Sequence, residues 1–223
     1  MNTHGLVPTG KDDEHNQWRR TRLIIAPHPD DEVLGCGGLL AKYPEECVVA
    51  VCSIPSETRR LEAAAARSVL GYRETHWLEL QPDYGGRGLV TVFDDLLDKH
   101  QPDEIYLPYP DLHQDHIAVY EAGMRAARIS MKESHWYVRA VFIYHVAPYT
   151  TELAPTGLRF DTFEDISGWP VVAKARAMDA YQSETAPPPS PSNGRALLSQ
   201  AAALGSLHRL EAAEHYAAIR VIR

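Results

Sequence analysis

The stretch RLIIAPHPDDEVLGCGG, residues 22–38, decides the fold of this chain. It opens with an unbroken apolar run, which is typical of a strand buried on both faces of a sheet. His28, the acidic run Asp30–Glu32 and a glycine-rich turn follow at once. Like charges this close repel one another, so the loop needs a cation, hydrogen-bond partners or free access to water. The rest of the chain indicates which of these applies.

Outward from this stretch, strand and helix patterns alternate, which predicts an α/β fold with a mostly parallel sheet. Strands are expected at 22–27, 47–54, 75–80, 103–108 and 140–146, and helices at about 34–43, 56–70, 88–100 and 115–130. The last third of the chain reads as one or two short strands within 156–167, a helix over 171–184, a Pro/Ser loop at 186–194 and an Ala-rich helix over 195–218. We expect the Pro/Ser loop to be a surface connection rather than an active-site lid.

Length and composition place the chain among globular proteins. With 223 residues, 44% of them hydrophobic, one domain over residues 21–223 is expected after a polar, poorly ordered tail at residues 1–20. The net charge of −8 argues against a surface for nucleic acid. No apolar run approaches the ~20 residues of a membrane span. Three cysteines without a CxxC pair, and no apolar leader, indicate the cytoplasm.

A second polar cluster follows the fourth expected strand. In EIYLPYPDLHQDHIAVYEAG, residues 104–123, an apolar strand ends and His113, Asp115 and His116 come just before a helix. In an open α/β sheet ligands bind beyond the carboxyl ends of the strands, where the strand order reverses. For the common order 3-2-1-4-5, that point lies between the first and fourth strands. We therefore expect the two polar clusters to face each other.

Two histidines and a carboxylate, with one position left for water, form a catalytic zinc set. His28, Asp31 and His116 can supply it, although His113 has equivalent spacing and the residues alone leave that choice open. In the structural alternatives, Asp30 or Asp31 only caps the following helix, and HQDH is a solvated helix start. The occurrence of both clusters at matching strand ends favours a site over these alternatives.

The glycine turn is weaker evidence for function. Gly35, Gly37 and Gly38 do not complete a GxGxxG pattern, and the second strand has no clear ribose-binding acid at its tip, which disfavours a dinucleotide cofactor. We expect these glycines to permit tight packing of helix on strand, Cys36 to be a small packed side chain, and Glu32 to belong to the helix start.

The chain resembles the LmbE-like, or PIG-L, family of zinc-dependent N-acetylglucosaminyl de-N-acetylases. The resemblance rests on APHPDDEVLGCGG at 26–38 and PDLHQDH at 110–116, and it extends through 59–71 and 174–184. It implies a Rossmann-like, three-layer αβα fold with the site at the carboxyl ends of the first and fourth strands. It also implies hydrolysis of an N-acetyl group, commonly on an amino sugar.

The resemblance also implies roles for individual residues. The implied ligands of one Zn²⁺ per chain are His28, Asp31 and His116; Asp30 is the implied general base, His113 stabilises the transition state in its charged form, and Asp115 orients His113 and favours that charge. Two departures, the short SIPSE loop at 53–57 and SE at 183–184, concern substrate contacts and leave this catalytic set intact.

Candidate substrate contacts come from other loops near the expected crevice. They are Arg59 and Arg60 at the start of a helix, Asp83 and Tyr84 after the third strand, and His145 after the fifth strand. As alternatives, the arginines pair with Glu57 or Glu62 on an exposed helix, and His145 has a core or surface role.

The expected function is removal of the acetyl group from the N-acetyl amine of a small amino sugar or sugar conjugate by zinc-activated water. A homo-oligomer is compatible with the sequence. One alternative is a metal-dependent hydrolase of another bond, such as a phosphoester or another amide; a phosphoester site would hold about two metal ions. The other is a non-catalytic module that binds a sugar or nucleotide without turnover.

Overall fold

Strand β1 (Arg22–Ala26) lies inside a seven-stranded sheet in the computed structural model, which describes residues 20–80, 87–130, 135–146 and 156–222. The strand order is β3-β2-β1-β4-β5-β7-β6, which contains the expected 3-2-1-4-5 order. The first five strands are parallel, and β7 is antiparallel to β5 and to β6. The other strands are β2 (Cys47–Ser53), β3 (Glu74–Leu80), β4 (Glu104–Pro108), β5 (Ala140–Tyr144), β6 (Thr162–Asp165) and β7 (Ala213–Val221).

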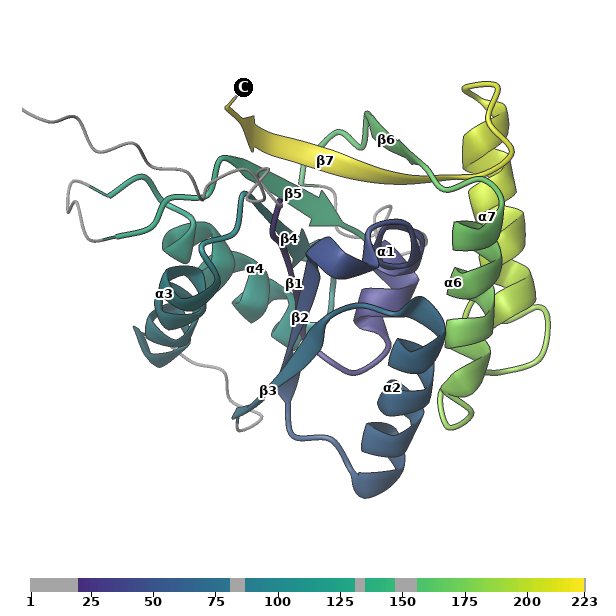
Figure 1. The fold of residues 1–223 in the computed structure, drawn as a ribbon, viewed down its shortest axis with the longest axis horizontal. Coiled ribbons are helices and arrows are strands. Elements are labelled where there is room, and N and C mark those ends of the chain that lie inside the picture. The colour runs from purple at the N-terminus through teal and green to yellow at the C-terminus, as the bar shows by residue number, and fades with distance from the viewer. Residues whose placement is uncertain (1–19, 81–86, 131–134, 147–155, 223) are drawn as a thin grey trace, which may run out of the picture.

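Helices cover both faces of the sheet, as expected for a three-layer αβα fold (Figure 1). One face carries α3 (Arg87–His100) and α4 (Gln114–Ala126). The other face carries α1 (Asp31–Lys42), α2 (Glu57–Leu70), α6 (Trp169–Ala180) and α7 (Gly194–Ser206). A short 3₁₀ turn (Pro44–Glu46) leads into β2.

The apolar run of β1 divides between the two layers because successive side chains of a strand point to opposite faces. Leu23 and Ile25 pack in the core that includes Phe93 of α3, and Ile24 packs in the core that includes Leu39 of α1. Every residue of β1 is buried. This explains the unbroken apolar pattern that identified the strand.

The Ala-rich helix expected over 195–218 is wrong in its second half. Helix α7 ends at Ser206, and strand β7 begins at Ala213. Strand β7 fills the space between β5 and β6 and buries Tyr216 and Ala217 there. Pairing on both sides outweighs the high helix propensity of the alanines, as happens when tertiary context opposes local propensity.

The structure leaves some expectations untested. The expected tail at residues 1–20 lies outside the described residues except for Arg20, and so do Asp83 and Tyr84. None of the helices in the described ranges combines the length and apolarity needed to cross a bilayer.

Candidate metal centre and active site

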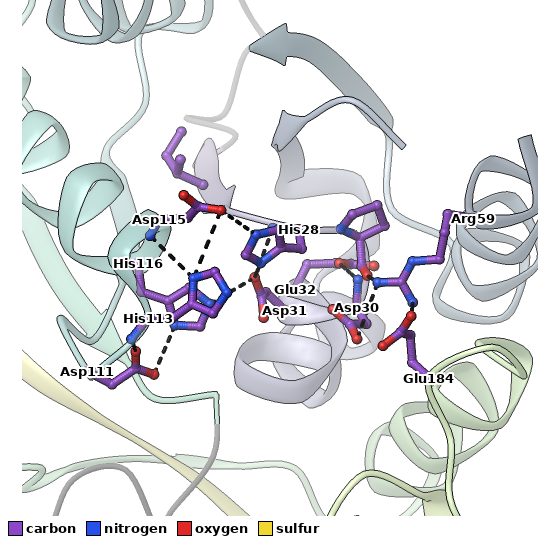
Figure 2. A network of polar contacts seen from close by, with 12 residues as sticks. His28, Asp30, Asp31, Glu32, Arg59, Asp111, His113, Asp115, His116 and Glu184 are labelled. Atoms are coloured by element: carbon purple, nitrogen blue, oxygen red, sulfur yellow. Dashed lines mark hydrogen bonds and ion pairs between the residues drawn. The ribbon is translucent and has the colours of Figure 1, made fainter. Parts of the chain in front are cut away.

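Two loops converge at the carboxyl ends of β1 and β4. These strands are parallel neighbours, so the loop that follows β1 and the turn that opens α4 lie side by side. Figure 2 shows their histidines and acids facing one another. The ligand atoms of His28, Asp31 and His116 lie within 4.8 Å of one another. The structure thus brings together the three expected metal ligands, which are 88 residues apart at the widest.

Asp31 lies at the centre of this group, and its side chain is only 4% exposed. Its Oδ2 accepts the backbone N–H of His28 at 2.9 Å and lies 3.2 Å from His28 Nδ1 and 3.5 Å from His116 Nε2. Burial alone would raise the pKa of Asp31, but hydrogen bonds and charge from His116 and His28 hold that pKa well below its ordinary value. The carboxylate is therefore ionised and ready to act as a ligand.

His116 is held by a second carboxylate, Asp111. The Nδ1 of His116 lies 2.9 Å from Oδ2 of Asp111, and this contact leaves Nε2 facing Asp31. Burial lowers the pKa of His116, but the two carboxylates outweigh it and raise that pKa to about 10. Ligand histidines commonly carry such a carboxylate on the other ring nitrogen, which fixes the tautomer. No role was assigned to Asp111 from the sequence. Its position five residues before a proposed ligand histidine could have suggested that it orients that histidine.

Asp30 occupies the residue just before α1 and has φ of 115°. This backbone region is unfavourable for a residue with a Cβ, and such strain concentrates at functional positions. The Asp30 N–H donates to Glu32 Oε2 at 2.9 Å, and Tyr181 donates its hydroxyl to the same carboxylate at 2.6 Å. Burial and the Asp31 charge raise the pKa of Asp30 well above its ordinary value, against the opposing effect of Arg59.

Arg59 reaches the site, whereas Arg60 does not. Arg59 lies 3.5 Å from Asp30 and 2.9 Å from Glu184, and it also donates to the carbonyl oxygen of Pro29. Arg60 pairs with Glu79 of β3 instead. The alternative pairing of these arginines with Glu57 or Glu62 is therefore wrong, because α2 turns its first residues toward the loop after β1 and toward β3.

His113 and Asp115 flank the three expected ligands. Asp115 Oδ2 lies 2.9 Å from His28 Nε2 but 3.9 Å from His113 Nδ1, so its carboxylate contacts His28 more closely than the ring it was expected to orient. Partial burial and the neighbouring His116 and His28 lower the pKa of His113, opposite to the direction expected from Asp115. The Nδ1 of His113 accepts the backbone N–H of Asp115 at 3.3 Å.

His28, His113 and Asp115 also form a group with ligand atoms within 4.8 Å, so two overlapping ligand sets share His28. The set with Asp31 and His116 is more deeply buried, because the side chains of Asp31 and His116 are 4% and 7% exposed and that of His113 is 52% exposed. It is also the set in which a further carboxylate, that of Asp111, orients His116.

His145, which was expected to line the crevice as a substrate contact, packs instead against residues of β7 and the segment before β6. Its Nε2 faces Nε2 of His215 on β7, and its ring packs edge-on against Phe160 at 4.9 Å. With Lys174 and Glu214 these histidines line a small cavity of about 30 Å³ between α1, α6 and α7. Burial and the neighbouring His215 lower the pKa of His145 to about 3.

Known proteins resemble this chain in sequence and in fold. Residues 23–127 match the profile of the family described as PIG-L: GlcNAc-PI de-N-acetylase. The uncharacterized deacetylase YaiS of Escherichia coli (strain K12) is 26% identical over 128 residues, which are 49% of this chain and 69% of the relative.

Two solved structures share the fold. N,N'-diacetylchitobiose deacetylase from Pyrococcus horikoshii has a TM-score of 0.70 at 20% identity, covering 93% of this chain and 87% of the other. The 4-carboxy-2-hydroxymuconate hydratase GalB from Pseudomonas putida KT2440 has a TM-score of 0.73 at 18% identity, covering 92% and 98%. The family match over residues 23–127 includes both polar clusters, so this part of the chain is similar to the PIG-L, or LmbE-like, family.

Proposed function

We propose that this chain is a zinc-dependent hydrolase that removes the acetyl group from the N-acetyl amine of an amino sugar or sugar conjugate. The observation that carries the proposal is the meeting of His28, Asp31 and His116 beside Asp30 in a chain similar to a family described as de-N-acetylases. We propose one catalytic domain over residues 21–223. The three cysteines are buried free thiols, which fits our proposal of a cytoplasmic protein.

The residues present fit a zinc ion. Two imidazoles and one carboxylate are a ligand set of catalytic zinc sites, which keep a further position open. Asp111 supports the fit because it leaves Nε2 of His116 free to bind. When bound, zinc would lower the pKa of water toward about 7 and polarise an acetyl carbonyl. We propose that this centre holds one zinc ion, bound by His28, Asp31 and His116.

Asp30 is the proposed general base. In amide hydrolysis the water oxygen bonds to the acetyl carbon, the C–N bond breaks, and the products are acetate and the amine. Asp30 adjoins a proposed ligand in sequence and would take the proton that the attacking water loses. The guanidinium of Arg59 lies 3.5 Å from its carboxylate and helps to fix its direction. The amine takes up a proton as it leaves.

His113 is the proposed stabiliser of the oxyanion. Its Nδ1 accepts the backbone N–H of Asp115, which leaves the ring proton on Nε2 free to donate. The ring is half-exposed and lies 4.8 Å, centroid to centroid, from that of His28. A donor there would stabilise the negative oxygen that forms on the acetyl carbon. Asp115 holds this ring through its backbone N–H.

The direct test is acetate release from a panel of N-acetylglucosamine conjugates. Zinc-loaded protein should release acetate from at least one conjugate, and protein stripped with a chelator should regain activity when zinc is restored. Acetate release that persists after removal of all metal would overturn the mechanism. Binding of a conjugate without any acetate release would instead indicate the non-catalytic module.

The shared fold of the hydratase GalB supports a second candidate, metal-dependent addition of water to a carbon–carbon double bond. The same protein should be offered 4-carboxy-2-hydroxymuconate and followed by ultraviolet absorbance. Hydration of this compound, with no acetate released from any sugar conjugate, would favour the second candidate.

A further inference from the structure

A second group of metal-ligating side chains lies on the edge strand β3, where the end of α3 packs against it. Glu74 and His76 are alternate residues of β3 and therefore share the face that α3 covers. His100 is the last residue of α3. Ligand atoms of the three residues lie within 4.8 Å of one another. Glu74 opens its strand, so this cluster lies at the amino end of the parallel strands, opposite the His28 site.

The cluster is closed by protein on one side and open to solvent on the other. The Nε2 of His76 lies 3.3 Å from one oxygen of Glu74, and Nδ1 of His100 lies 3.7 Å from the other. The two rings are 4.6 Å apart between centroids. The His100 side chain is 5% exposed and that of Glu74 is 41% exposed. An ion could therefore enter past Glu74 and reach both imidazoles.

Two ring nitrogens in this cluster make no hydrogen bond, although Nε2 of His76 lies within ion-pair distance of Glu74 at 3.3 Å. Within the described residues, Nε2 of His76 and Nε2 of His100 are both buried without a hydrogen bond. Buried polar atoms without a hydrogen bond are rare and costly, so two such nitrogens side by side, of which that of His76 has only the ion-pair contact with Glu74, need an explanation.

We propose that Glu74, His76 and His100 bind a divalent transition metal ion, with zinc the expected ion, at a site distinct from the His28 centre. Two imidazoles and a carboxylate suit zinc and leave a fourth position for water. The ion would join the first residue of the edge strand to the last residue of α3. It would also replace the long contact of 3.9 Å between Arg73 and Glu74. Its expected effect is to stabilise the fold at this edge.

Zinc content per chain tests the proposal without depending on the first site. Wild-type protein is loaded with zinc, freed of excess by gel filtration and measured by atomic emission, beside the double variant His76→Gln/His100→Gln. The double variant should hold one zinc fewer than wild type, whatever the His28 centre holds. The matched control His208→Ala removes an exposed histidine that belongs to none of the metal-ligating groups among the described residues, and it should leave the content unchanged. Equal zinc content in wild type and double variant would overturn the proposal.

A second measurement covers the case in which the double variant folds poorly. Glu74 is well exposed, so Glu74→Gln should fold normally and bind zinc at this site at least tenfold more weakly. Zinc should raise the thermal unfolding midpoint of wild type by about 5 °C more than that of Glu74→Gln. The same zinc-induced rise in both proteins would contradict a role of Glu74 as ligand and with it the site.

Discussion

At the residue scale, two features distinguish this site from a simple helix start. They are the backbone conformation of Asp30 and the Asp111 carboxylate that contacts His116. Asp30 holds a positive φ at the residue where α1 begins, and its side chain makes no capping hydrogen bond. Asp30 therefore does not act as a side-chain cap of α1. Instead its carboxylate lies between the metal-ligating group and Arg59.

The variant Asp30→Asn should keep zinc and lose about 10²–10⁴-fold in kcat. Asparagine tolerates positive φ better than alanine does, so the backbone should hold while the base is lost. Acetate release and zinc content are measured on the same sample, with Asp31→Asn in parallel. Asp31→Asn should lose zinc, and a reversed outcome would show that base and ligand are exchanged.

The variant Asp111→Ala should weaken zinc binding about 10–100-fold. Asp111 holds Nδ1 of His116 and also accepts the backbone N–H of His113 at 2.7 Å, so its loss frees both. Competition with a chromogenic chelator gives the affinity. Asp111→Asn retains an acceptor oxygen and should recover part of the lost zinc affinity. Unchanged zinc affinity in Asp111→Ala would show that Asp111 does not orient His116.

At the element scale, helix α1 approaches β5 and α6 closely enough that its glycines are required. The hydroxyl of Tyr144 on β5 donates to the carbonyl oxygen of Ile25 at 2.8 Å, and its ring fills the space beside Gly35. A Cβ at Gly37 would lie 2.8 Å from the Lys174 side chain of α6, and one at Gly38 would lie 2.6 Å from Ile166 just before that helix. The expectation that these glycines serve close packing is confirmed.

The variant Gly35→Ala should lower the free energy of unfolding by about 1–3 kcal/mol, because the new methyl group overlaps the Tyr144 ring. Gly88→Ala on α3 is the matched control, since an added Cβ there meets nothing within 4 Å. The control should be neutral or stabilising by up to about 1 kcal/mol. Urea unfolding measures both, and equal effects would contradict the packing argument.

The His145–His215 pair links the segment after β5 to β7 and predicts a pH dependence of stability. Burial lowers the pKa of His215 to about 4, with Lys174 opposing its charge and Glu214 favouring it. Both histidines titrate near pH 6.5 when unfolded, so between about pH 6.5 and pH 4 the unfolded chain binds more protons. Stability from this pair is therefore complete above pH 6.5 and is lost as the pH falls through that window.

The double variant His145→Gln/His215→Gln isolates this effect from the other titrating groups. Each proton taken up on unfolding contributes about 1.4 kcal/mol per pH unit to the slope, so the wild type should lose stability more steeply than the variant. Urea unfolding at pH 4.5, 5.5 and 7 gives the two slopes. Parallel slopes would show that the pair does not stay neutral in the folded protein.

At the scale of the whole molecule, a buried ion pair between α6 and β7 holds helix α1, whose first residue is Asp31 of the site. Lys174 of α6 donates to Glu214 of β7 at 2.6 Å and to the carbonyl oxygen of Leu34 at 2.8 Å. Glu214 accepts the backbone N–H groups of Gly38 and Leu39, both at 2.8 Å. Helix α1 is thereby held by elements about 140–180 residues further along the chain.

The variant Lys174→Met should lower the free energy of unfolding by about 3–5 kcal/mol, because it leaves Glu214 buried without its cation. The side chains of this pair are 7% and 3% exposed. Lys42→Met is the control, since the Lys42–Glu164 pair is 31% and 25% exposed and should contribute less than about 1 kcal/mol. Urea unfolding compares them; a small loss in Lys174→Met would show that the pair does not secure α1.

The sequence by itself determined the parallel core of the fold and the two loops that meet in the site. Five parallel strands and the helices between them follow from local periodicity, which is a property of neighbouring residues, and the strand order follows the common 3-2-1-4-5 pattern of such sheets. The HPDD and HQDH clusters were identifiable because each places histidines and acids directly after an apolar strand, at the end of the sheet where open α/β folds bind ligands. Among the helices, α1 begins earlier than expected, at Asp31, because its first turn carries the acids that belong to the site.

Only the tertiary structure decided what depends on residues far apart in the chain. Strand β7 forms where both neighbours pair with it, Arg59 turns to Asp30 rather than to the acids of its own helix, and Asp115 approaches His28 more closely than His113. The Glu74–His76–His100 cluster likewise exists only because α3 packs its end against an edge strand. Such contacts depend on the energetics of burial and pairing across the whole fold, which no local pattern encodes.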